Sequence, residues 1–367
     1  MGKWDMVRLG DVCEKKIATL PAGFSKEIIY VDISSVDNTS KEITSYQEIS
    51  GKDAPSRARQ ILNSNDVIVS TVRPNLNAVA MNTIDSSNTV VASTGYCVLR
   101  CKKGVDAKYV FKFCQTEKFI SSLVKVAKGA SYPAVSNTDV KYVEIPLPPL
   151  DEQKRIAKNL DLASEIVKGY KEQLAELDKL VQSVFYEMFG DPVTNEKGWE
   201  KHKWKVVFNT TTGKLDSNAM VESGEYPFFT CAKEQLWIDK YDFDCEALLL
   251  AGNNAAGVYD VKYYKGKFNA YQRTYVLTLK NDTHSYRLFK LQLENKLQLL
   301  KHQSKGTNTR YLTMGILNEL DFIIPPLPLQ TRFAAIVTEI EAQKAQVQRA
   351  LTEAENLFNS LMQEYFE

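Results

Sequence analysis

Histidine and paired cysteines are scarce in this chain of 367 residues. It has three histidines, and its six cysteines (13, 97, 101, 114, 231 and 245) are scattered without a Cys-x-x-Cys pair. Because structural zinc sites are built from closely spaced cysteine and histidine ligands, this composition argues against a metal site. We expect reduced thiols in a cytoplasmic protein.

Long apolar runs are also missing. No stretch approaches the roughly 20 apolar residues of a membrane span, and the start Met1-Gly2-Lys3-Trp4-Asp5 lacks the apolar core of a signal peptide. We therefore expect no membrane association. The length of the chain leaves room for two or three domains, each with its own core.

The sequence patterns of common catalytic sites are absent too. There is no Walker-type phosphate loop, no Gly-x-Gly-x-x-Gly and no His-Glu-x-x-His. The segment Gly252–Gly257 begins and ends with glycine but lacks a following Lys-Ser/Thr, so we interpret it as a turn between strands. The Asn/Asp-Pro-Pro-Tyr/Phe motif that amino-methyltransferases use on a flipped base is also missing. The sequence predicts no catalytic, cofactor or metal site in this chain.

What the chain does contain is a repeat. The segment Pro148–Ala157 (PPLDEQKRIA) returns as Pro325–Ala334 (PPLPLQTRFA), with Pro, Pro, Leu, Gln, Arg and Ala coinciding at an offset of 177. Lys128-Gly129 recurs as Lys305-Gly306 at the same offset. Two similar halves suit a ligand with two-fold-like symmetry, and duplex DNA is the commonest ligand of that kind.

A long heptad pattern follows each copy. Apolar residues alternate at spacings of four and three from about Leu150 to Met188, and the same spacing returns after Pro325 with Lys344 as its one polar member. Lys344 either extends its ammonium group to water or helps to fix the register. Each helix alone could pack on its own domain, but two matched seams favour a helix pair. The predicted interface comprises Ile156, Leu160, Ala163, Val167, Tyr170, Leu174, Leu177, Val181, Phe333, Val337, Ile340, Val347, Leu351, Phe358 and Leu361.

We expect this pair to be antiparallel. The chain must leave the first helix to build the second half, and antiparallel packing carries the two halves to opposite ends. Ala163 would then face Phe358, and Leu177 would face Lys344. Strand-forming segments at 28–31, 66–72, 226–230 and 275–279, with short helices at 107–126 and 285–302, predict an α+β fold for both halves.

Positive and negative charges are unevenly distributed along the chain, although the net charge is only +1. Residues 1–144 carry 19 lysines and arginines against 15 acidic residues, and residues 191–323 carry 18 against 16. The two helical segments are both net negative. This split weakly supports contact between DNA and the globular halves.

Polar loops in the globular halves are the candidate DNA-binding segments. Thr71–Asn77 offers guanidinium and amide groups that can bond base edges, although an ordinary connection between strands explains it equally well. The equivalent segments that begin at Lys128 and Lys305 can approach phosphates. Lys262–Lys267 is either a DNA-facing hairpin or a solvated turn. The candidate residues are Arg57, Arg59, Arg73, Asn75, Asn77, Lys125, Lys128, Ser131, Tyr132, Lys214, Asn253, Asn254, Tyr263, Lys265, Lys267, Lys305, Thr307, Asn308 and Arg310.

The repeated Pro-Pro-Leu-x-x-Gln-x-Arg segment, each time leading into a long helix, resembles the specificity (S) subunit of Type I restriction–modification systems. Residues 145–156 are very like the signature of that family, and Phe189-Gly190-Asp191-Pro192 after the first helix also fits. The second copy departs from it at Leu329 and Thr331, which replace an acidic and a basic residue.

The resemblance implies a non-catalytic, DNA-reading subunit of a restriction system. Its parts would be a first target recognition domain (1–144), a central conserved helical region (145–190), a second recognition domain (191–323) and a C-terminal helical region (324–367). Each recognition domain would read one half of a bipartite, asymmetric target in double-stranded DNA.

The resemblance also implies partners. The coiled-coil helices would set the spacing of the half-sites and dock two methyltransferase (M) subunits, and restriction (R) subunits would complete the assembly. S-adenosylmethionine, ATP and Mg²⁺ would be bound by those partners. Two alternatives remain: a coiled-coil scaffold with two protein-binding domains and no DNA role, and a fused methylase-recognition enzyme, for which 367 residues leave no room.

Overall fold

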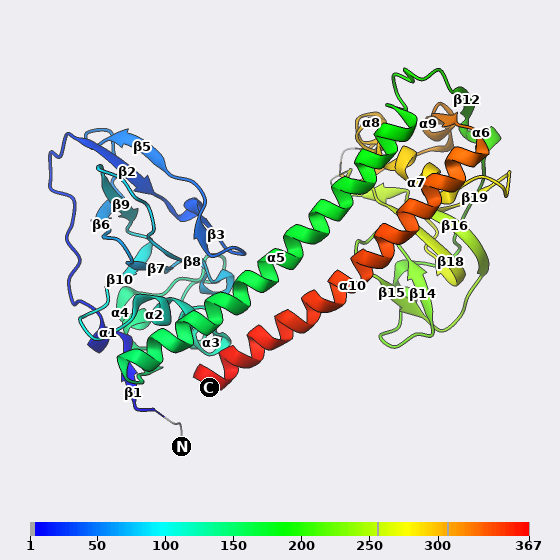
Figure 1. Ribbon diagram of the computed structural model, residues 1–367. Helices are drawn as coiled ribbons and strands as arrows, with labels where there is room; N and C mark the ends of the chain where they lie inside the picture. The colour runs from blue at the N-terminus through cyan, green and yellow to red at the C-terminus, as the bar shows by residue number, and fades with distance from the viewer. Residues whose placement is uncertain (1–3, 255–256, 307, 367) are drawn as a thin grey trace. The chain divides into compact units, whose positions relative to one another are not determined.

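The computed structural model describes residues 4–254, 257–306 and 308–366 (Figure 1). The chain divides into two compact units, Met1–Tyr170 with Ala350–Glu367 and Lys171–Arg349. We call them unit 1 and unit 2. Each unit contains one globular part and one half of each long helix, so the borders between the units fall within the helices.

Unit 1 combines small sheets with short helices. Its sheets have the strand orders β5-β2-β9-β6, β10-β7-β8, β3-β4 and β1-β11. The strands are β1 (Met6–Arg8), β2 (Glu27–Val31), β3 (Val36–Asp37), β4 (Glu42–Ile43), β5 (Gln47–Ser50), β6 (Ala58–Ile61), β7 (Val67–Ser70), β8 (Val79–Met81), β9 (Thr89–Ser93), β10 (Tyr96–Leu99) and β11 (Glu144–Pro146). The helices are α1 (Leu9–Val12), α2 (Ala107–Phe113), α3 (Glu117–Val126) and α4 (Asn137–Tyr142), with 3₁₀ turns at Ile33–Ser35 and Pro74–Leu76.

Unit 2 is built around a larger sheet with the strand order β13-β19-β16-β18-β14-β15, beside the two-stranded sheets β12-β21 and β17-β20. The strands are β12 (Glu200–Lys203), β13 (Phe208–Thr212), β14 (Tyr226–Phe229), β15 (Leu236–Ile238), β16 (Phe243–Ala251), β17 (Asn253–Asn254), β18 (Val261–Ala270), β19 (Thr274–Leu279), β20 (Arg310–Tyr311) and β21 (Asp321–Ile324). The helices are α6 (Trp204–Val207), α7 (Tyr286–Glu294), α8 (Leu297–Gln303) and α9 (Met314–Asn318), with a 3₁₀ turn at Ser217–Ala219. The predicted α+β class is confirmed for both halves.

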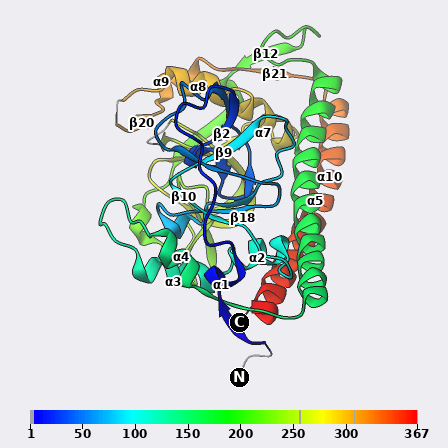
Figure 2. The same ribbon diagram turned by 90° about the vertical axis from the view of Figure 1, so that its left-hand side faces the viewer.

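The two long helices are α5 (Leu150–Phe189) and α10 (Leu327–Phe366). In each unit one half of α5 lies beside one half of α10, and the two helices run antiparallel (Figures 1 and 2). α5 ends where Gly190 adopts a φ of 73°, the left-handed conformation that suits a glycine cap, and Pro192 follows it. The predicted antiparallel helix pair is confirmed.

The contacts between the helices follow the predicted register closely. Lys344 forms an ion pair with Asp178, the neighbour of its predicted partner Leu177. The ring of Phe333 lies 5.2 Å from that of Phe189 and 5.9 Å from that of Phe185. All fifteen seam residues are buried or half-buried. Lys344 therefore does more than extend to water, because its ion pair links the two helices.

Each core uses the start of one long helix and the end of the other. In unit 1, Ile156 and Leu160 of α5 share a core with Phe366 of α10, whose ring lies 5.1 Å from that of Tyr109 in α2. In unit 2, Phe185 and Phe189 of α5 share a core with Phe333 and Val337 of α10 and with α7 residues. The helix pair is therefore part of both hydrophobic cores.

The two predicted short helices are each split in two. The segment 107–126 forms α2 and α3, because the hydroxyl group of Thr116 accepts a hydrogen bond from the Phe119 N–H and starts a new helix. The segment 285–302 forms α7 and α8, with Asn295 and Lys296 between them.

The pseudo-repeat seen in the sequence is reproduced in the strand pairing. Val7 of β1 pairs with Ile145 of β11, and His202 of β12 pairs with Phe322 of β21. The paired positions differ by 195 on the first strand and by 177 on the second, which are the offsets of the tryptophans Trp4 and Trp199 and of the proline-rich segment.

The glutamine shared by the two proline-rich segments has the same contacts in both units. The side-chain oxygen of Gln153 accepts a hydrogen bond from the Asp106 N–H at 2.9 Å, and its amide donates to the Pro148 carbonyl at 2.8 Å. Gln330 accepts from the Ser285 N–H at 3.1 Å and donates to the Pro325 carbonyl at 2.8 Å. Asp106 and Ser285 are the N-cap residues of α2 and α7. The glutamine thus ties the start of each long helix to a helix of the globular part.

An ion pair strengthens the same connection in unit 1. Asp161 of α5 lies 2.9 Å from the ammonium group of Lys108 and 3.0 Å from that of Lys112, both on α2. Burial opposes ionisation of Asp161, but the hydrogen bonds and charges of the two lysines prevail and keep its pKa below the ordinary value. In unit 2, Arg287 of α7 pairs with Glu341 of α10 in a corresponding way.

We predict that each glutamine stabilises only its own unit. Both side chains are 1% exposed, so replacement by alanine leaves buried polar groups without partners, at a cost of about 1–3 kcal/mol each. Gln153→Ala should speed hydrogen exchange in α2, and Gln330→Ala should speed it in α7, measured by peptide-resolved mass spectrometry. Gln173→Ala, at an exposed position of α5, is the matched control. Equal acceleration in both units from either variant would contradict a local role.

Candidate nucleic-acid interface

Two loops at equivalent places close in the same way. In unit 1, Lys128 and Ala134 exchange both backbone hydrogen bonds, each at 2.9 Å. In unit 2, the Lys305 N–H donates to the Tyr311 carbonyl at 3.1 Å, and the Tyr311 N–H donates back at 2.8 Å. Lys305 and Tyr311 lie 177 residues after Lys128 and Ala134, which is the offset of the sequence repeat. The equivalence predicted from Lys-Gly is therefore a shared loop structure.

The glycine of each loop is required by its geometry. Gly129 has a φ of 104° and Gly306 has a φ of 101°. Residues with a side chain rarely adopt these backbone angles. A Cβ atom would also lie 2.8 Å from the Tyr132 carbonyl oxygen at Gly129 and 2.1 Å from that of Thr309 at Gly306. Both loops depend on glycine for the turn and for the close approach.

A second segment lies against each of these loops. In unit 1 the Val135 N–H donates to the Thr71 carbonyl at 2.9 Å, and the Arg73 N–H donates to the Pro133 carbonyl at 2.7 Å. In unit 2 the Leu312 N–H donates to the Gly252 carbonyl at 2.8 Å, and β17 pairs with β20. Gly252–Gly257 lies between β16 and β18, but its Asn253 and Asn254 form the short strand β17 and its residues 255–256 lie outside the described residues, so the predicted turn stays a prediction. We call these combinations loop pair 1 (residues 71–77 and 128–134) and loop pair 2 (residues 252–254 and 305–311).

Loop pair 1 presents cationic, amide and aromatic side chains. Arg73 has a φ of 49° and precedes the 3₁₀ turn Pro74–Leu76. Its guanidinium carbon lies 4.7 Å from the centre of the Tyr132 ring, which is 69% exposed. Stacking on tyrosine holds the arginine at the surface between the two segments. The other exposed candidates here are Asn75, Lys128, Ser131 and, at the end of α3, Lys125.

Loop pair 2 presents a different set of side chains. Asn253 pairs with Tyr311 and Asn254 pairs with Arg310 across β17 and β20. The guanidinium of Arg310 donates to the Lys301 carbonyl at 3.0 Å. This bond uses one of the several N–H groups that a guanidinium carries. Lys305 and Asn308 are exposed, and Thr307 lies outside the described residues.

Arg273 is a residue that the sequence reasoning missed. It is exposed, and its carbonyl accepts a hydrogen bond from the Gly252 N–H at 2.8 Å, which places it next to loop pair 2. The corresponding acceptor in unit 1 is Gly95, where a Cβ atom would lie 2.3 Å from Ile33. Gly95 and Arg273 precede β10 and β19, and they are related by the offset of 178 between those strands. No sequence pattern marks an isolated arginine in a turn as a binding residue.

Asn77 lies inside unit 1. It is 7% exposed, and its amide donates to the Cys114 carbonyl at 3.2 Å. Its own carbonyl accepts from the Lys41 ammonium group at 2.7 Å, and burial lowers the pKa of Lys41. The αL backbone at Asn77, with a φ of 47°, turns the side chain inward after the 3₁₀ turn. Asn77 therefore belongs to the support of loop pair 1 and leaves the set of candidates that can meet a base.

The segment Lys262–Lys267 lies within β18, so the predicted solvated turn is wrong, whereas the predicted DNA-facing hairpin stays a prediction. Pairing with β16 keeps this segment extended along the ten-residue strand. Tyr263 donates to Glu246 at 2.9 Å, and the Lys265 ammonium lies 3.1 Å from the same carboxylate. Burial and Glu246 raise the pKa of Tyr263 to about 12. Lys267 lies 4.7 Å from the ring of Tyr241.

The remaining candidates lie outside the two loop pairs. Arg57 and Arg59 are exposed at β6, and the Arg57 carbonyl accepts from the Thr94 N–H, next to Gly95. Lys214 is exposed after β13. Of the nineteen predicted residues, the structure thus brings together six around loop pair 1, counting Lys125, and five described residues around loop pair 2.

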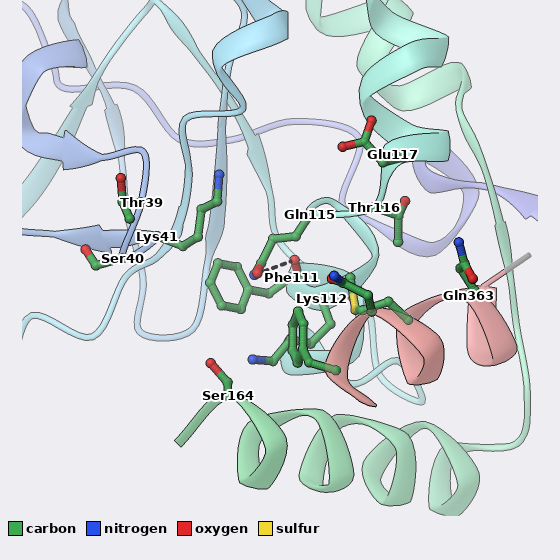
Figure 3. A pocket seen from close by; sticks show the side chains of 13 residues that line it. Thr39, Ser40, Lys41, Phe111, Lys112, Gln115, Thr116, Glu117, Ser164 and Gln363 are labelled. Atoms are coloured by element: carbon green, nitrogen blue, oxygen red, sulfur yellow. Dashed lines mark hydrogen bonds between the residues drawn. The ribbon is translucent and has the colours of Figure 1, made fainter. Parts of the chain in front are cut away.

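A pocket of about 530 Å³ in unit 1 lies elsewhere (Figure 3). It is lined by the β3–β4 turn, the α2–α3 junction, Ser164 of α5 and the end of α10. Its buried Lys112 pairs with Asp161, and Gln115 donates to the Phe111 carbonyl at 3.2 Å. The lining residues include no histidine or cysteine.

Over the described ranges, no cluster of His, Cys, Asp and Glu has the arrangement of a metal site. The same residues include no helix with the length and apolarity that a membrane crossing requires.

Comparison with known proteins identifies the family. The family model of the Type I restriction modification DNA specificity domain matches residues 1–177 and 196–355. The chain belongs to this family. It is a specificity subunit of a Type I restriction–modification system and is non-catalytic.

Individual relatives agree. The chain is 35% identical over 157 residues to the Type I restriction enzyme EcoDI specificity subunit of Escherichia coli, a match that covers 40% of this chain and about a third (34%) of that protein. It is 23% identical to the MjaIX specificity subunit of Methanocaldococcus jannaschii over 91% of this chain and 86% of that protein. A solved structure described as the basis of complex assembly and conformational transition of the type I R-M system has 27% identity and a TM-score of 0.57, with 99% of this chain and 97% of that chain covered.

We predict that a methyl group at either loop glycine opens its loop. Gly129→Ala and Gly306→Ala should speed amide exchange at Ala134 and Tyr311 respectively, because the Cβ atom collides with backbone. Gly104→Ala is the matched control, since Gly104 has a φ of 92° but open space around the added atom. It carries the conformational cost of about 1 kcal/mol without the collision. Unchanged exchange at both loops would show that the closing bonds survive the collision.

Proposed function

We propose that this specificity subunit reads one half of a bipartite, asymmetric DNA target with each loop pair. The observation that carries the proposal is that the two halves present surface loops of identical closure but different side chains. A repeated frame supports binding to two equivalent places on a duplex. Different side chains support two different half-site sequences.

Loop pair 1 has the chemistry for direct reading of the major groove. Arginine makes bidentate hydrogen bonds to guanine and asparagine makes them to adenine, and Arg73 and Asn75 are exposed close together in the sequence. Stacking on Tyr132 reduces the freedom that Arg73 would lose on binding. Lys125 and Lys128 are suited to phosphates, which position the protein without specifying sequence.

Loop pair 2 would read its half-site with other groups. Asn253 and Asn254 offer amides, and Arg310 and Arg273 offer guanidinium groups. Arg273 occupies the position of Gly95 in unit 1, so loop pair 2 has a guanidinium group that can bond a base where loop pair 1 has no side chain. Lys305 would contact phosphate. Arg57, Arg59 and Lys214 remain candidates for flanking contacts, whereas Lys265 and Tyr263 already share Glu246.

We also propose that the long helices dock two methyltransferase subunits and set the half-site spacing. Their exposed faces carry large apolar side chains at Leu162, Ile166 and Leu180 of α5 and at Leu357 of α10. Exposed apolar groups of this size favour a protein partner. S-adenosylmethionine would be bound by the methyltransferase subunits, and ATP and Mg²⁺ by restriction subunits.

The first test is DNA binding. We expect weak binding by this chain alone, because an excess of six positive charges over residues 1–144 and 191–323 gives little general attraction to phosphate. With co-expressed methyltransferase subunits, Arg73→Ala should weaken binding to the DNA sequence that the complex methylates by about 1–3 kcal/mol. It should also relax the sequence preference at one base of that target. Lys128→Ala should weaken binding to all sequences and reduce the salt dependence by about one charge.

Lys265→Ala is the matched control, because that lysine is exposed and ion-paired but lies outside both loop pairs. Fluorescence anisotropy on duplex DNA over a range of salt concentrations would measure all three variants. Nanomolar binding by the chain alone that equals binding by the complex would refute the division of labour. Stable assembly with the methyltransferase subunits but no DNA affinity in the complex would favour the protein-binding scaffold instead.

The second test concerns spacing. Deleting residues 167–173 and 344–350 removes one heptad from each helix and keeps both seams in phase. At 1.5 Å per residue the helices shorten by about 10 Å, which corresponds to about three base pairs of B-DNA. Genome-wide mapping of methylated adenine should find both half-site sequences with a spacer shorter by about that number, from an original separation of about 10–15 base pairs between half-site centres. An active, assembled variant that methylates at the original spacing would show that the helices do not set the distance.

A further inference from the structure

Two cysteines of unit 1 face each other across a pair of antiparallel segments. Cys13 follows α1, Cys101 follows β10, and the two form an isolated antiparallel bridge. The flanking hydrogen bonds run from the Glu14 N–H to the Arg100 carbonyl at 2.8 Å and from the Lys102 N–H to the Val12 carbonyl at 3.0 Å. The cysteines themselves exchange no backbone bond, so they occupy the narrow, non-hydrogen-bonded kind of pair.

This kind of pair has the geometry of a disulfide. Its Cα atoms are about 4.5 Å apart and its side chains lie on the same face, whereas disulfides need Cα separations of about 4.4–6.8 Å. Cys101 is half-buried and reachable by a small solute, and Cys13 is fully buried against the core. Formation of the bond therefore needs no movement of the backbone.

The environment also favours reaction. The neighbouring Cys101 side chain, helped by the charges of Lys141 and Lys102, lowers the pKa of Cys13 against the opposing effect of burial, and Cys13 together with burial raises the pKa of Cys101. A lowered pKa favours the thiolate form of Cys13, which is the nucleophile in thiol oxidation. The two other cysteines of the same core differ, because burial raises the pKa of Cys97 to about 12 and raises that of Cys114 as well.

We propose that Cys13 and Cys101 are a thiol modification site that closes reversibly to a cross-strand disulfide when hydrogen peroxide reaches it. One sulfur attacks the peroxide, the O–O bond breaks, and a sulfenic acid and water form. The second sulfur then displaces the hydroxyl group as water and forms the S–S bond. The two thiols lose two electrons and two protons, and the peroxide becomes two waters.

The position of the bond defines its effect. The chain between Cys13 and Cys101 forms β2 to β10, whereas α1, α2, α3, α4 and β11 lie outside that stretch. The two cysteines therefore stand where the chain enters and leaves the strand-rich part of unit 1, which carries Arg73. A disulfide there would close residues 13–101 into a covalent ring. It would restrain the local unfolding in which this stretch separates from α1, α2, α3 and α4.

The experiment treats the purified full-length chain, and separately its complex, with increasing hydrogen peroxide and then blocks free thiols by alkylation. Peptide mapping without reduction should find a Cys13–Cys101 cross-link at lower peroxide than oxidation of Cys231 or Cys245, and a dithiol should reverse it. The cross-link should slow amide exchange at Glu14 and Lys102 by about 10- to 100-fold. Cys97→Ala is the matched control and should leave the cross-link intact, whereas Cys101→Ala should abolish it.

Three outcomes would overturn the proposal. These are cross-links to Cys97 or Cys114 in similar yield, oxidation of Cys101 that stops at sulfinic acid with Cys13 still free, and a cross-link that appears only when the chain unfolds. Because the readout is chemical, none of these results depends on whether the loop pairs bind DNA.

Discussion

The antiparallel packing of α5 with α10 is the constraint on which the rest of the structure depends. A heptad seam on a single helix leaves an apolar stripe that must be covered. Here the stripe of one helix covers that of the other, and the ends of the seams continue into the two cores. Phe366 belongs to the core of unit 1 and Phe333 to that of unit 2. Neither globular part is complete without residues from both helices.

This arrangement explains which residues the repeat keeps. Gln153 and Gln330 are identical because each satisfies a backbone N–H at the start of α2 or α7 and a carbonyl of its own proline-rich segment. An unsatisfied buried amide would cost more than any surface change. Leu329 and Thr331 replace the acidic and basic residues at exposed or half-buried positions of the second copy, where no such contact is lost. The repeat is thus conserved within the chain where the long helix joins the globular part.

The loop pairs show the opposite behaviour. Their backbones close alike, through Lys128 with Ala134 and Lys305 with Tyr311, while the side chains around them differ. Glycine is retained in both because the turn requires it, but the position of Gly95 becomes Arg273 in the other half. A fixed backbone with variable side chains is the arrangement that allows one fold to present two different binding surfaces. The family assignment and this pattern are independent, since the first rests on sequence matching and the second on backbone contacts.

The sequence by itself determined the long-range plan of this protein. Heptad spacing, the offset of 177, and caps such as Gly190 fixed the helices, their partnership and the two-fold repetition, because periodicity and special backbone conformations are written in local residue types. The tertiary structure alone decided which polar residues meet. Asn77 turned inward, Lys262–Lys267 joined a strand, and the helix after Ala107 broke at Thr116, because pairing across sheets and burial outweigh local propensity. Arg273 and the pair of Cys13 and Cys101 gained their neighbours from segments distant in the chain, and no local pattern records such a meeting.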